Sequence, residues 1–534
     1  MTQRTPARTR IRESFNSRTV FILAAVGSAV GLGNIWRFPY VTYENGGGAF
    51  LIPYLIALLT AGLPILLFDY ALGHRFRGSP PLAFKRLHRH AEPIGWLQVG
   101  ICFLISIYYA AIIAWAAMYT WYSFTQAWGD DAESFFFTEY LQYDGAGADG
   151  SGLSVDFVAQ VGWPLIAVWV VLLVALALGV RRGIARVSIY GIPVLFVMFL
   201  ILVGYSLTLD GALTGLNALF TPDWSALTSG TVWIQAYGQI FFSLSVGFGI
   251  MITYASYLKR KSNATGSGLV VGFANSSFEL LAAIGVFSAL GFIAVAANTA
   301  VEEVATSGLG LAFVAFPTII SEAPASALLG VLFFGSLTLA GITSQISVLE
   351  VAISSVKDKT GWSRPVTVAL VGGSSALVSV VLLGGVSGLT VLDVIDAFSN
   401  NIGIVAAAFI AVLAVTWGFR RLDVLADGMN AYGSIKLGFI WKSLIGVVLP
   451  LVLGVLLVMD IRTKVTEGYG GFDTWVVMTF GWGALGFVVV AAVVLTALPW
   501  RTDSALHAEV LEEEPDSEPA AHIENSAHRR GARD

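Results

Sequence analysis

The 534-residue chain has few charged side chains and a single cysteine. Only 12% of its residues are Asp, Glu, Lys or Arg, whereas 56% are hydrophobic, and the mean hydropathy is +0.76. This balance excludes a disordered chain and an ordinary soluble domain. The lone Cys102 excludes an internal disulfide, and the six histidines show no metal-ligand spacing. No phosphate-binding loop is present either, which argues against an ATP-driven pump.

The sequence contains many long apolar runs. A helix that crosses a bilayer needs about 20 mostly apolar residues. About twelve runs of that length are separated by clusters of charge or turn residues, at approximately 19–43, 48–73, 95–127, 163–180, 187–209, 231–258, 265–297, 325–356, 364–383, 390–417, 436–459 and 475–498. The sequence therefore predicts an all-α polytopic membrane protein with about 12 transmembrane helices.

Cationic side chains gather in alternate loops between these runs. Lys and Arg cluster before the first run and after the second, fourth, sixth, eighth and tenth, whereas the loop 128–162 is acidic. Since cytoplasmic loops carry the excess of Lys and Arg, we expect both termini in the cytoplasm. Residues 1–18 then form a basic cytoplasmic segment, and residues 499–534 form an acidic, disordered cytoplasmic tail.

Glycines break two of the apolar runs. Residues 27–34 read GSAVGLGN, and residues 243–249 read SLSVGFG. Backbone can unwind at membrane depth only where protein, an ion or a ligand satisfies the freed peptide groups. One break opens each set of five runs, which predicts a 5+5 inverted repeat (19–209 and 231–417) with a shared site near mid-depth, followed by two further helices at 436–498.

Three strings resemble the neurotransmitter:sodium symporter family, in particular its bacterial amino-acid transporters such as the leucine transporter. They are GSAVGLGN at 27–34 with RFP at 37–39, ENGGGAF at 44–50, and GQIFFSLS at 238–245 with GFG at 247–249. The resemblance covers about 19–460. It implies a leucine-transporter-like fold with unwound helices 1 and 6, in the plasma (inner) membrane of a prokaryote.

The resemblance also implies two sodium ions held by hard oxygen donors. The first ion is assigned the carbonyl of Ala29, the side chains of Asn34 and Asn275, the carbonyl and hydroxyl of Ser243, and the substrate carboxylate. The second is assigned the carbonyls of Gly27, Val30 and Ala340 and the hydroxyls of Thr343 and Ser344. Without the resemblance, Asn275 reads equally well as an interhelical hydrogen-bonding residue, and Thr343 and Ser344 read as hydroxyls bonded to their own helix.

An α-amino acid suits the implied substrate site. Its carboxylate would meet the first sodium, the amides of Leu32 and Gly33 and the hydroxyl of Tyr109, and its ammonium would meet carbonyls near Ala29 and Phe242 and the hydroxyl of Ser245. The lining is assigned to Ser28, Ala29, Leu32, Gly33, Ile105, Tyr109, Phe242, Ser243, Ser245, Phe248, Ser344 and Val348. The side-chain end has no counter-charge, which favours a neutral, apolar amino acid. Ile105 fills space and Val348 leaves it, so alanine, leucine and an aromatic amino acid all stay open, with an aliphatic one favoured. Gly31 stands where monoamine transporters of the family carry an aspartate, so a monoamine is disfavoured.

The resemblance also implies two gates and a residue that balances the charge of the bound sodium. The outer gate is assigned to Arg37 and Asp396, braced by Gln239, and the inner gate to Arg12 and Asp358, braced by Tyr257. Arg12 and Asp358 read equally well as two solvated charges when taken alone. Glu279 would supply the negative charge that chloride supplies in other members, so no chloride requirement is expected. It also leaves open a proton antiport, or a buried acid that stays neutral.

We therefore expect a secondary active transporter, not an enzyme, that couples two sodium ions to a neutral L-amino acid by alternating access. The alternatives are a proton-coupled amino-acid carrier of the same fold, a non-transporting amino-acid sensor, and a membrane-embedded enzyme acting on lipids. The expected partners are the amino acid and the lipid bilayer, with no nucleic acid. Both a monomer and a dimer remain open.

Overall fold

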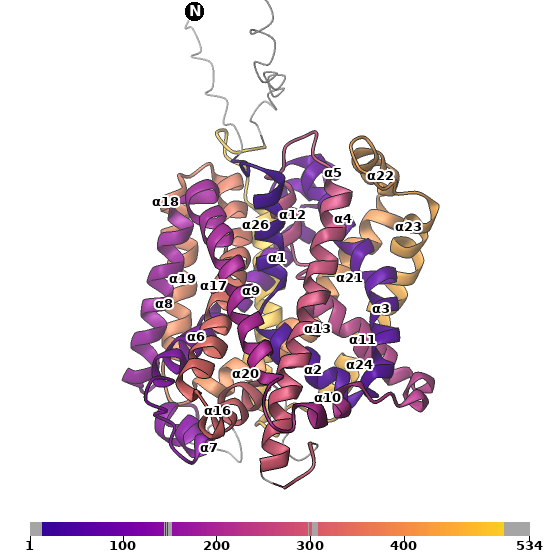
Figure 1. Cartoon of the computed structure of the whole chain (residues 1–534). Coiled ribbons are helices and arrows are strands. Elements are labelled where there is room, and N and C mark those ends of the chain that lie inside the picture. Colours follow the sequence, from indigo (N-terminus) through magenta and orange to yellow (C-terminus); the bar gives the residue numbers. More distant parts are fainter. Residues whose placement is uncertain are drawn as a thin grey trace, which may run out of the picture.

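The chain forms a bundle of helices that run along one axis (Figure 1). The computed structural model describes residues 13–143, 145, 147, 152–296, 298–301 and 308–506, and within these ranges it contains no strand. Ten helical stretches are long and apolar enough to cross a membrane, and the bent pair α1 (Arg18–Ala29) and α2 (Leu32–Glu44) makes an eleventh. The remaining expected span is divided between α11 (Gly230–Ser243) and α12 (Ile250–Ala255). The predicted all-helical polytopic fold is thereby confirmed.

The long helices follow the predicted apolar runs, and six short ones lie between the runs. In the first half the remaining helices are α3 (Leu51–Ala57), α4 (Leu63–Phe76), α5 (Pro80–Leu87), α6 (Glu92–Tyr122), α7 (Ala132–Ser134), α8 (Ala159–Ala177), α9 (Ala185–Ser206) and α10 (Ala212–Phe220). In the second half they are α13 (Ala264–Ala296), α15 (Gly308–Gly310), α16 (Phe316–Glu322), α17 (Ser326–Thr360), α18 (Arg364–Thr367), α19 (Gly373–Leu383), α20 (Gly388–Phe398) and α21 (Val405–Leu413). The last are α22 (Leu422–Asn430), α23 (Phe439–Ser443), α24 (Leu449–Thr466), α25 (Thr474–Val476) and α26 (Ala484–Ala497). The six short helices between the runs are α5, α7, α10, α15, α16 and α22.

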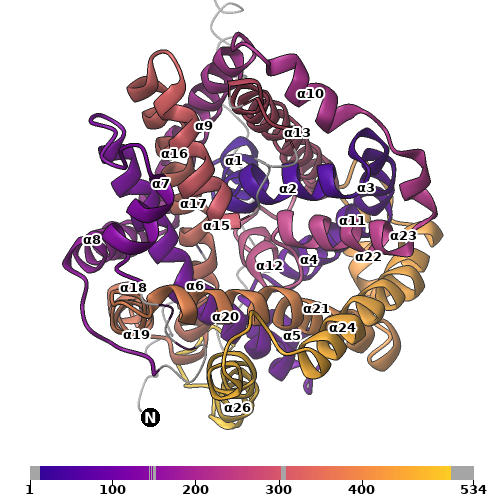
Figure 2. The ribbon, with the colours of Figure 1, turned by 90° about the horizontal axis from the view of Figure 1, so that it is seen from below.

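The broken helices lie inside the bundle and the unbroken apolar ones surround them (Figure 2). Helices α1 and α12 are central, whereas α8, α24 and α26 lie at the rim. Burial differs in the same sense, since 83% of the most apolar stretch of α6 is buried but only 28% of that of the span Thr474–Ala497, which ends in α26. Both ends of the described chain lie at the same end of the bundle, which is consistent with termini on one side of the membrane (Figure 1).

The first break bends the chain by 56° between α1 and α2. Val30 and Gly31 are both extended there, so the carbonyls at the end of α1 and the amides at the start of α2 leave the helical ladder. The second break covers residues 244–249, where Ser245, Gly247 and Gly249 have φ of +52°, +83° and +95°. A Cβ on Gly247 would lie 2.6 Å from the Cβ of Ala408, so glycine is required by both its dihedral angle and its surroundings.

Protein groups satisfy the peptide of Gly247 in this second break. The Gly247 amide donates to Oδ2 of Asp69 on α4 at 2.9 Å, and Nε2 of Gln98 on α6 donates to the Gly247 carbonyl at 2.9 Å. The Phe248 carbonyl accepts from the Cys102 thiol at 3.1 Å. Unwound backbone is thus tolerated because neighbouring helices supply its partners.

Candidate functional site

A cavity of about 210 Å³ lies between the two breaks. Of the twelve residues expected to contact substrate, all except Ser243 line it. The other lining residues are Gly31, Asn34, Trp36, Tyr108, Ile112, Gly308, Leu309, Leu392, Asp393, Asp396, Asn400 and Ile404. Helices α1, α2, α6, α11, α17 and α20 all contribute to the lining, so the fold assembles segments from both halves of the chain around one space.

The carbonyl of Ser28, at the end of α1, receives two hydroxyl groups. Ser245 Oγ donates to it at 3.0 Å and Ser344 Oγ at 3.2 Å. Because each hydroxyl uses its only proton on this carbonyl, both of its lone pairs remain available as acceptors. At the end of α1 these two hydroxyls therefore present acceptors to a ligand, which suits an ammonium group or a cation.

Tyr109 closes the cavity against the start of α2. Its hydroxyl accepts from the Leu32 amide at 3.3 Å and also lies within hydrogen-bonding reach of the Ser344 hydroxyl, and its proton can turn toward an acceptor such as a ligand carboxylate. A Cβ at Gly31 would lie 2.9 Å from the Tyr109 oxygen, and one at Gly33 would lie 1.9 Å from a ring carbon of Phe242. Both glycines are therefore positions where the backbone closely approaches an aromatic side chain.

The side chains expected at the first sodium form one buried hydrogen-bonded chain. Oδ1 of Asn34 accepts from the Gly31 amide at 2.9 Å, and Nδ2 of Asn34 donates to Oδ1 of Asn275 at 2.9 Å. Nδ2 of Asn275 in turn donates to Oγ of Ser243. The structure thus brings Asn34, Asn275 and Ser243 together from α2, α13 and α11, beside the carbonyl end of α1.

The residues expected at the second sodium also meet, where α1 packs on α17. A Cβ on Gly27 would lie 3.4 Å from Cβ of Thr343, and Ser344 already contacts the end of α1. Oγ1 of Thr343 donates to the carbonyls of Leu339 and Ala340, at 3.1 and 3.0 Å. This bond to its own helix uses the proton of Thr343 and leaves the lone pairs of its oxygen free, but it also occupies the Ala340 carbonyl, one of the oxygens expected at this sodium.

Glu279 lies fully buried on α13 between two hydrogen-bond donors. Nε2 of Gln239 donates to its Oε1 at 2.6 Å, and the hydroxyl of Tyr54 donates to its Oε2. Gln239 was expected to brace the outer gate, but its bonded partner is Glu279. Tyr54 was not predicted from the sequence, because a tyrosine in an apolar run is typical of a side chain that only packs in the core.

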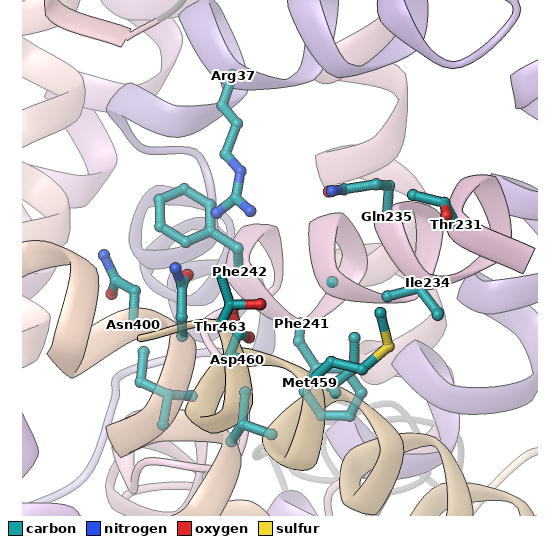
Figure 3. Close-up of a pocket in the computed structure, with 15 residues that line it drawn as sticks. Arg37, Thr231, Ile234, Gln235, Phe241, Phe242, Asn400, Met459, Asp460 and Thr463 are labelled. Atoms are coloured by element: carbon teal, nitrogen blue, oxygen red, sulfur yellow. The ribbon is translucent and has the colours of Figure 1, made fainter. Parts of the chain in front are cut away.

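The outer gate residues, Arg37 and Asp396, form no direct ion pair with each other in the part of the chain that the structure describes. Asp396 lines the cavity between the breaks. The guanidinium of Arg37 lies over the Phe242 ring, 4.5 Å from its centroid, and Asp396 accepts from Nδ2 of Asn400 at 2.7 Å. A second cavity of about 280 Å³ opens beyond Phe242, with Asp460 of α24 facing it (Figure 3). Phe242, Asn400 and Ile404 line both cavities. Asn400 and Asp460 were not predicted from the sequence.

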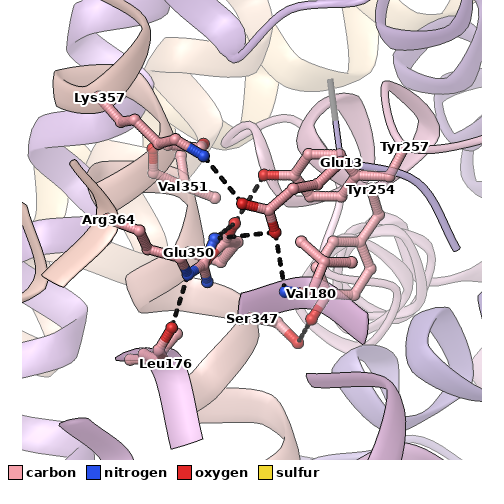
Figure 4. A network of polar contacts seen from close by, with 11 residues as sticks. Glu13, Leu176, Val180, Tyr254, Tyr257, Ser347, Glu350, Val351, Lys357 and Arg364 are labelled. Atoms are coloured by element: carbon pink, nitrogen blue, oxygen red, sulfur yellow. Dashed lines mark hydrogen bonds and ion pairs between the residues drawn. The ribbon is translucent and has the colours of Figure 1, made fainter. Parts of the chain in front are cut away.

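At the opposite end of the bundle, an ionic network ties the N-terminal segment to α17 (Figure 4). We call Glu13, Phe15, Tyr257, Glu350, Lys357 and Arg364 the inner seal. Nζ of Lys357 lies 2.9 Å from Glu13, and Arg364 pairs with Glu350 at 2.6 Å. The hydroxyl of Tyr257 donates to the same Glu350 at 2.6 Å.

Phe15 is the apolar part of the inner seal. Its ring is 2% exposed and meets Tyr254 and Tyr257 edge-on, and its amide donates to the Tyr257 carbonyl at 3.1 Å. Of the expected inner gate, Asp358 accepts from the Ser79 amide at 2.9 Å, whereas Arg12 lies outside the described residues. Tyr257, which was expected to brace the inner gate, donates its hydroxyl to Glu350.

Glu13 is held ionised by its surroundings. Burial raises its pKa, but the charges of Lys357 and Arg364 and hydrogen bonds from Lys357 and the Val180 amide outweigh burial and lower the pKa to about 2. A carboxyl with a depressed folded-state pKa stabilises the fold above its unfolded-state pKa, and that stability is lost as the pH falls toward the folded-state value.

We expect Glu13→Gln to destabilise the protein by about 1–2 kcal/mol at pH 7, less than for a fully buried pair because the Glu13 side chain is 31% exposed. The difference from wild type should stay constant from pH 8 to pH 5 and shrink below about pH 4.5. Thermal unfolding of both proteins across this range measures it. A difference that grows on acidification would contradict the assignment.

The amino-acid sequence is similar to those of known sodium-dependent transporters over most of its length. The model of the sodium:neurotransmitter symporter family matches residues 12–139 and 129–501. The chain is 40% identical to an uncharacterized sodium-dependent transporter of Methanocaldococcus jannaschii, over 91% of this chain and 97% of the relative. It is 28% identical to a sodium- and chloride-dependent taurine transporter of Rattus norvegicus (93% and 86%) and 29% identical to a sodium-dependent serotonin transporter of Drosophila melanogaster (86% and 78%). These matches confirm the resemblance found in the motifs, and the chain belongs to the sodium:neurotransmitter symporter family.

Proposed function

We propose that the protein imports a neutral, aliphatic L-amino acid by symport with two sodium ions and without chloride. The proposal places it in a prokaryotic plasma membrane with both termini in the cytoplasm, and residues 19–209 and 231–417 as the inverted repeats. The observation that carries it is the cavity between the two breaks. Acceptor oxygens line one end of this cavity, and a buried carboxylate, that of Glu279, lies near the residues assigned to the first sodium ion.

The lining of the cavity supports a neutral side chain. Apart from Asp393 and Asp396, the described residues that line it are uncharged. Both carboxylates already have partners, since Asp396 accepts from Asn400 and Asp393 accepts from the Tyr469 hydroxyl at 3.0 Å. Ile105 and Val348 offer apolar contact, and each buried methylene of a ligand contributes about 0.8 kcal/mol.

Reconstituted protein in proteoliposomes tests the proposal directly. With an inward sodium gradient, labelled leucine and alanine should accumulate, with and without chloride, and all twenty amino acids should be screened as competitors. Accumulation without a sodium gradient would favour the proton-coupled carrier. Sodium-dependent binding without accumulation would favour the sensor, and selective uptake of lysine or glutamate would overturn the neutral substrate.

Thr343→Val tests the second sodium site. Valine keeps the shape but removes the hydroxyl oxygen, and because interactions with a charged partner contribute about 1.5–3 kcal/mol, sodium-driven uptake should fall about 10- to 100-fold. Thr338→Val is the matched control, because Thr338 lies on the same helix and donates to the Phe334 carbonyl at 2.9 Å. Sodium titrations of uptake by both variants measure the effect. Equal losses in the two would show a helix effect, not a sodium site.

A further inference from the structure

After α26 the chain crosses the end of the bundle that also holds the inner seal (Figure 1). We call residues 498–506 the C-terminal strap. The Ala505 amide donates to the carbonyl of Asp358 at 2.9 Å, and the Arg501 amide donates to the carbonyl of Lys359 at 3.4 Å. The strap therefore supplies donors to the carbonyls in the last turn of α17.

Trp500 anchors the strap in a buried ion pair. Its indole N–H lies 3.1 Å from each carboxylate oxygen of Glu92, which is 1% exposed and also accepts from Nζ of Lys359 at 2.7 Å. That Nζ lies 5.3 Å from the Trp500 ring centroid and 5.4 Å from the centroid of Trp96. A hydrogen bond to a charged, desolvated group and a cation–π contact are both stronger here than at an exposed surface.

Arg86 of α5 ties the strap to a further helix. Its Nη2 donates to the carbonyl of Ala505 at 2.9 Å, while its Nη1 donates to the carbonyls of Phe76 and Arg77, at 2.7 and 3.2 Å. These last two carbonyls end α4. The strap is thus bonded directly to the end of α17 and, through the Arg86 side chain, to the end of α4.

The same turns of α17 carry the inner seal. Lys357, which pairs with Glu13, directly precedes Asp358 and Lys359, whose carbonyls hold the strap. We infer that the C-terminal strap is a built-in brace of the inner seal: by fixing the end of α17 against α4, it stabilises the inward-closed conformation, and its release favours inward opening. The inference rests on alternating access in the proposed function, because only then must the inner seal open.

The expected consequence is a population shift. A contact present only in the inward-closed state biases the equilibrium by its own free energy, and couplings of this kind typically correspond to factors of about 5 to 150. Releasing the strap should therefore expose the N-terminal segment more often, although none of the strap residues contacts Glu13 or Phe15 in any described hydrogen bond or ion pair.

Hydrogen–deuterium exchange of the full-length protein in sodium tests this inference. Trp500→Ala removes the anchor, and Ala505→Pro removes the N–H that donates to Asp358. In both variants the amides of residues 13–18 should exchange at least about five-fold faster than in wild type. Ala505→Ser keeps the N–H and is the matched control, and Trp163→Ala, at a 64% exposed tryptophan, controls for loss of an indole.

The exchange of residues 500–506 reports independently whether the strap has been released. Faster exchange there together with unchanged exchange at 13–18 would overturn the inference. Should Trp500→Ala fail to fold, Ala505→Pro decides, because it alters no transmembrane helix. The exchange measurement needs no substrate, so its outcome is independent of the uptake experiment. The brace can be disproved although sodium-driven uptake is found, and it can be demonstrated although uptake is not found.

Discussion

Glu279→Ser is expected to make transport depend on chloride. In chloride-free buffer the uptake rate should fall at least about 100-fold, and chloride should restore much of it. Removing one member of a buried charge-stabilised set costs about 3–5 kcal/mol, which corresponds to more than a hundredfold. Gln239 and Tyr54 would keep their donors aimed at the vacated space, where a small anion can accept them.

The measurement is the initial rate of labelled substrate uptake at fixed sodium, with chloride exchanged for gluconate. Glu279→Gln is the matched control, because glutamine has the size of glutamate, fills the same space and carries no charge. That variant should be equally slow but insensitive to chloride. If the serine variant works without chloride as well as wild type does, Glu279 does not balance the charge of a bound sodium.

The helices could be predicted from the sequence because the membrane imposes a simple rule. Each backbone group must be bonded within its own segment, so spanning helices appear as long apolar runs. The run predicted at 364–383 coincides with the span Arg364–Leu383, and the run at 265–297 with α13. Both breaks were visible from their glycines, but the glycines are needed for different reasons. Gly247 and Gly249 have positive φ, whereas Gly31 is extended and, like Gly33, lets the backbone approach an aromatic side chain closely.

Most of the cavity lining was expected from the family resemblance, which rests on short strings of consecutive residues. The pairings of polar side chains were not, since they join residues far apart in sequence. Tyr54 and Glu279 are separated by 225 positions, and Glu13 and Lys357 by 344. Gln239 shows the same limit, because the sequence places it on α11 but does not say whether its amide faces a gate or the carboxylate of α13.

Asn34 belongs to a buried hydrogen-bond network, so its replacement should have a larger effect than the loss of one sodium ligand alone. It links the first peptide of α2 to α13: its side-chain oxygen accepts from Gly31, and its side-chain nitrogen donates to Asn275. Truncation therefore leaves a buried donor and a buried acceptor unpaired, each at a cost of about 1–3 kcal/mol, besides removing an oxygen from the proposed first sodium site. The structural and ionic effects should appear together.

Asn34→Ala should accordingly reduce sodium-driven uptake at least about 100-fold and abolish the stabilisation of the protein by sodium. Asn34→Asp keeps the acceptor for Gly31 but loses the donor to Asn275, so it should retain part of the sodium response. Thr42→Val is the control on the same helix, because Thr42 is buried and its hydroxyl donates to the Phe38 carbonyl of its own helix at 2.9 Å. Thermal unfolding with sodium or potassium separates the two effects. A lower melting temperature with an intact sodium response would make Asn34 a helix-capping residue alone, whereas loss of the response in a folded protein requires its oxygen at the cation.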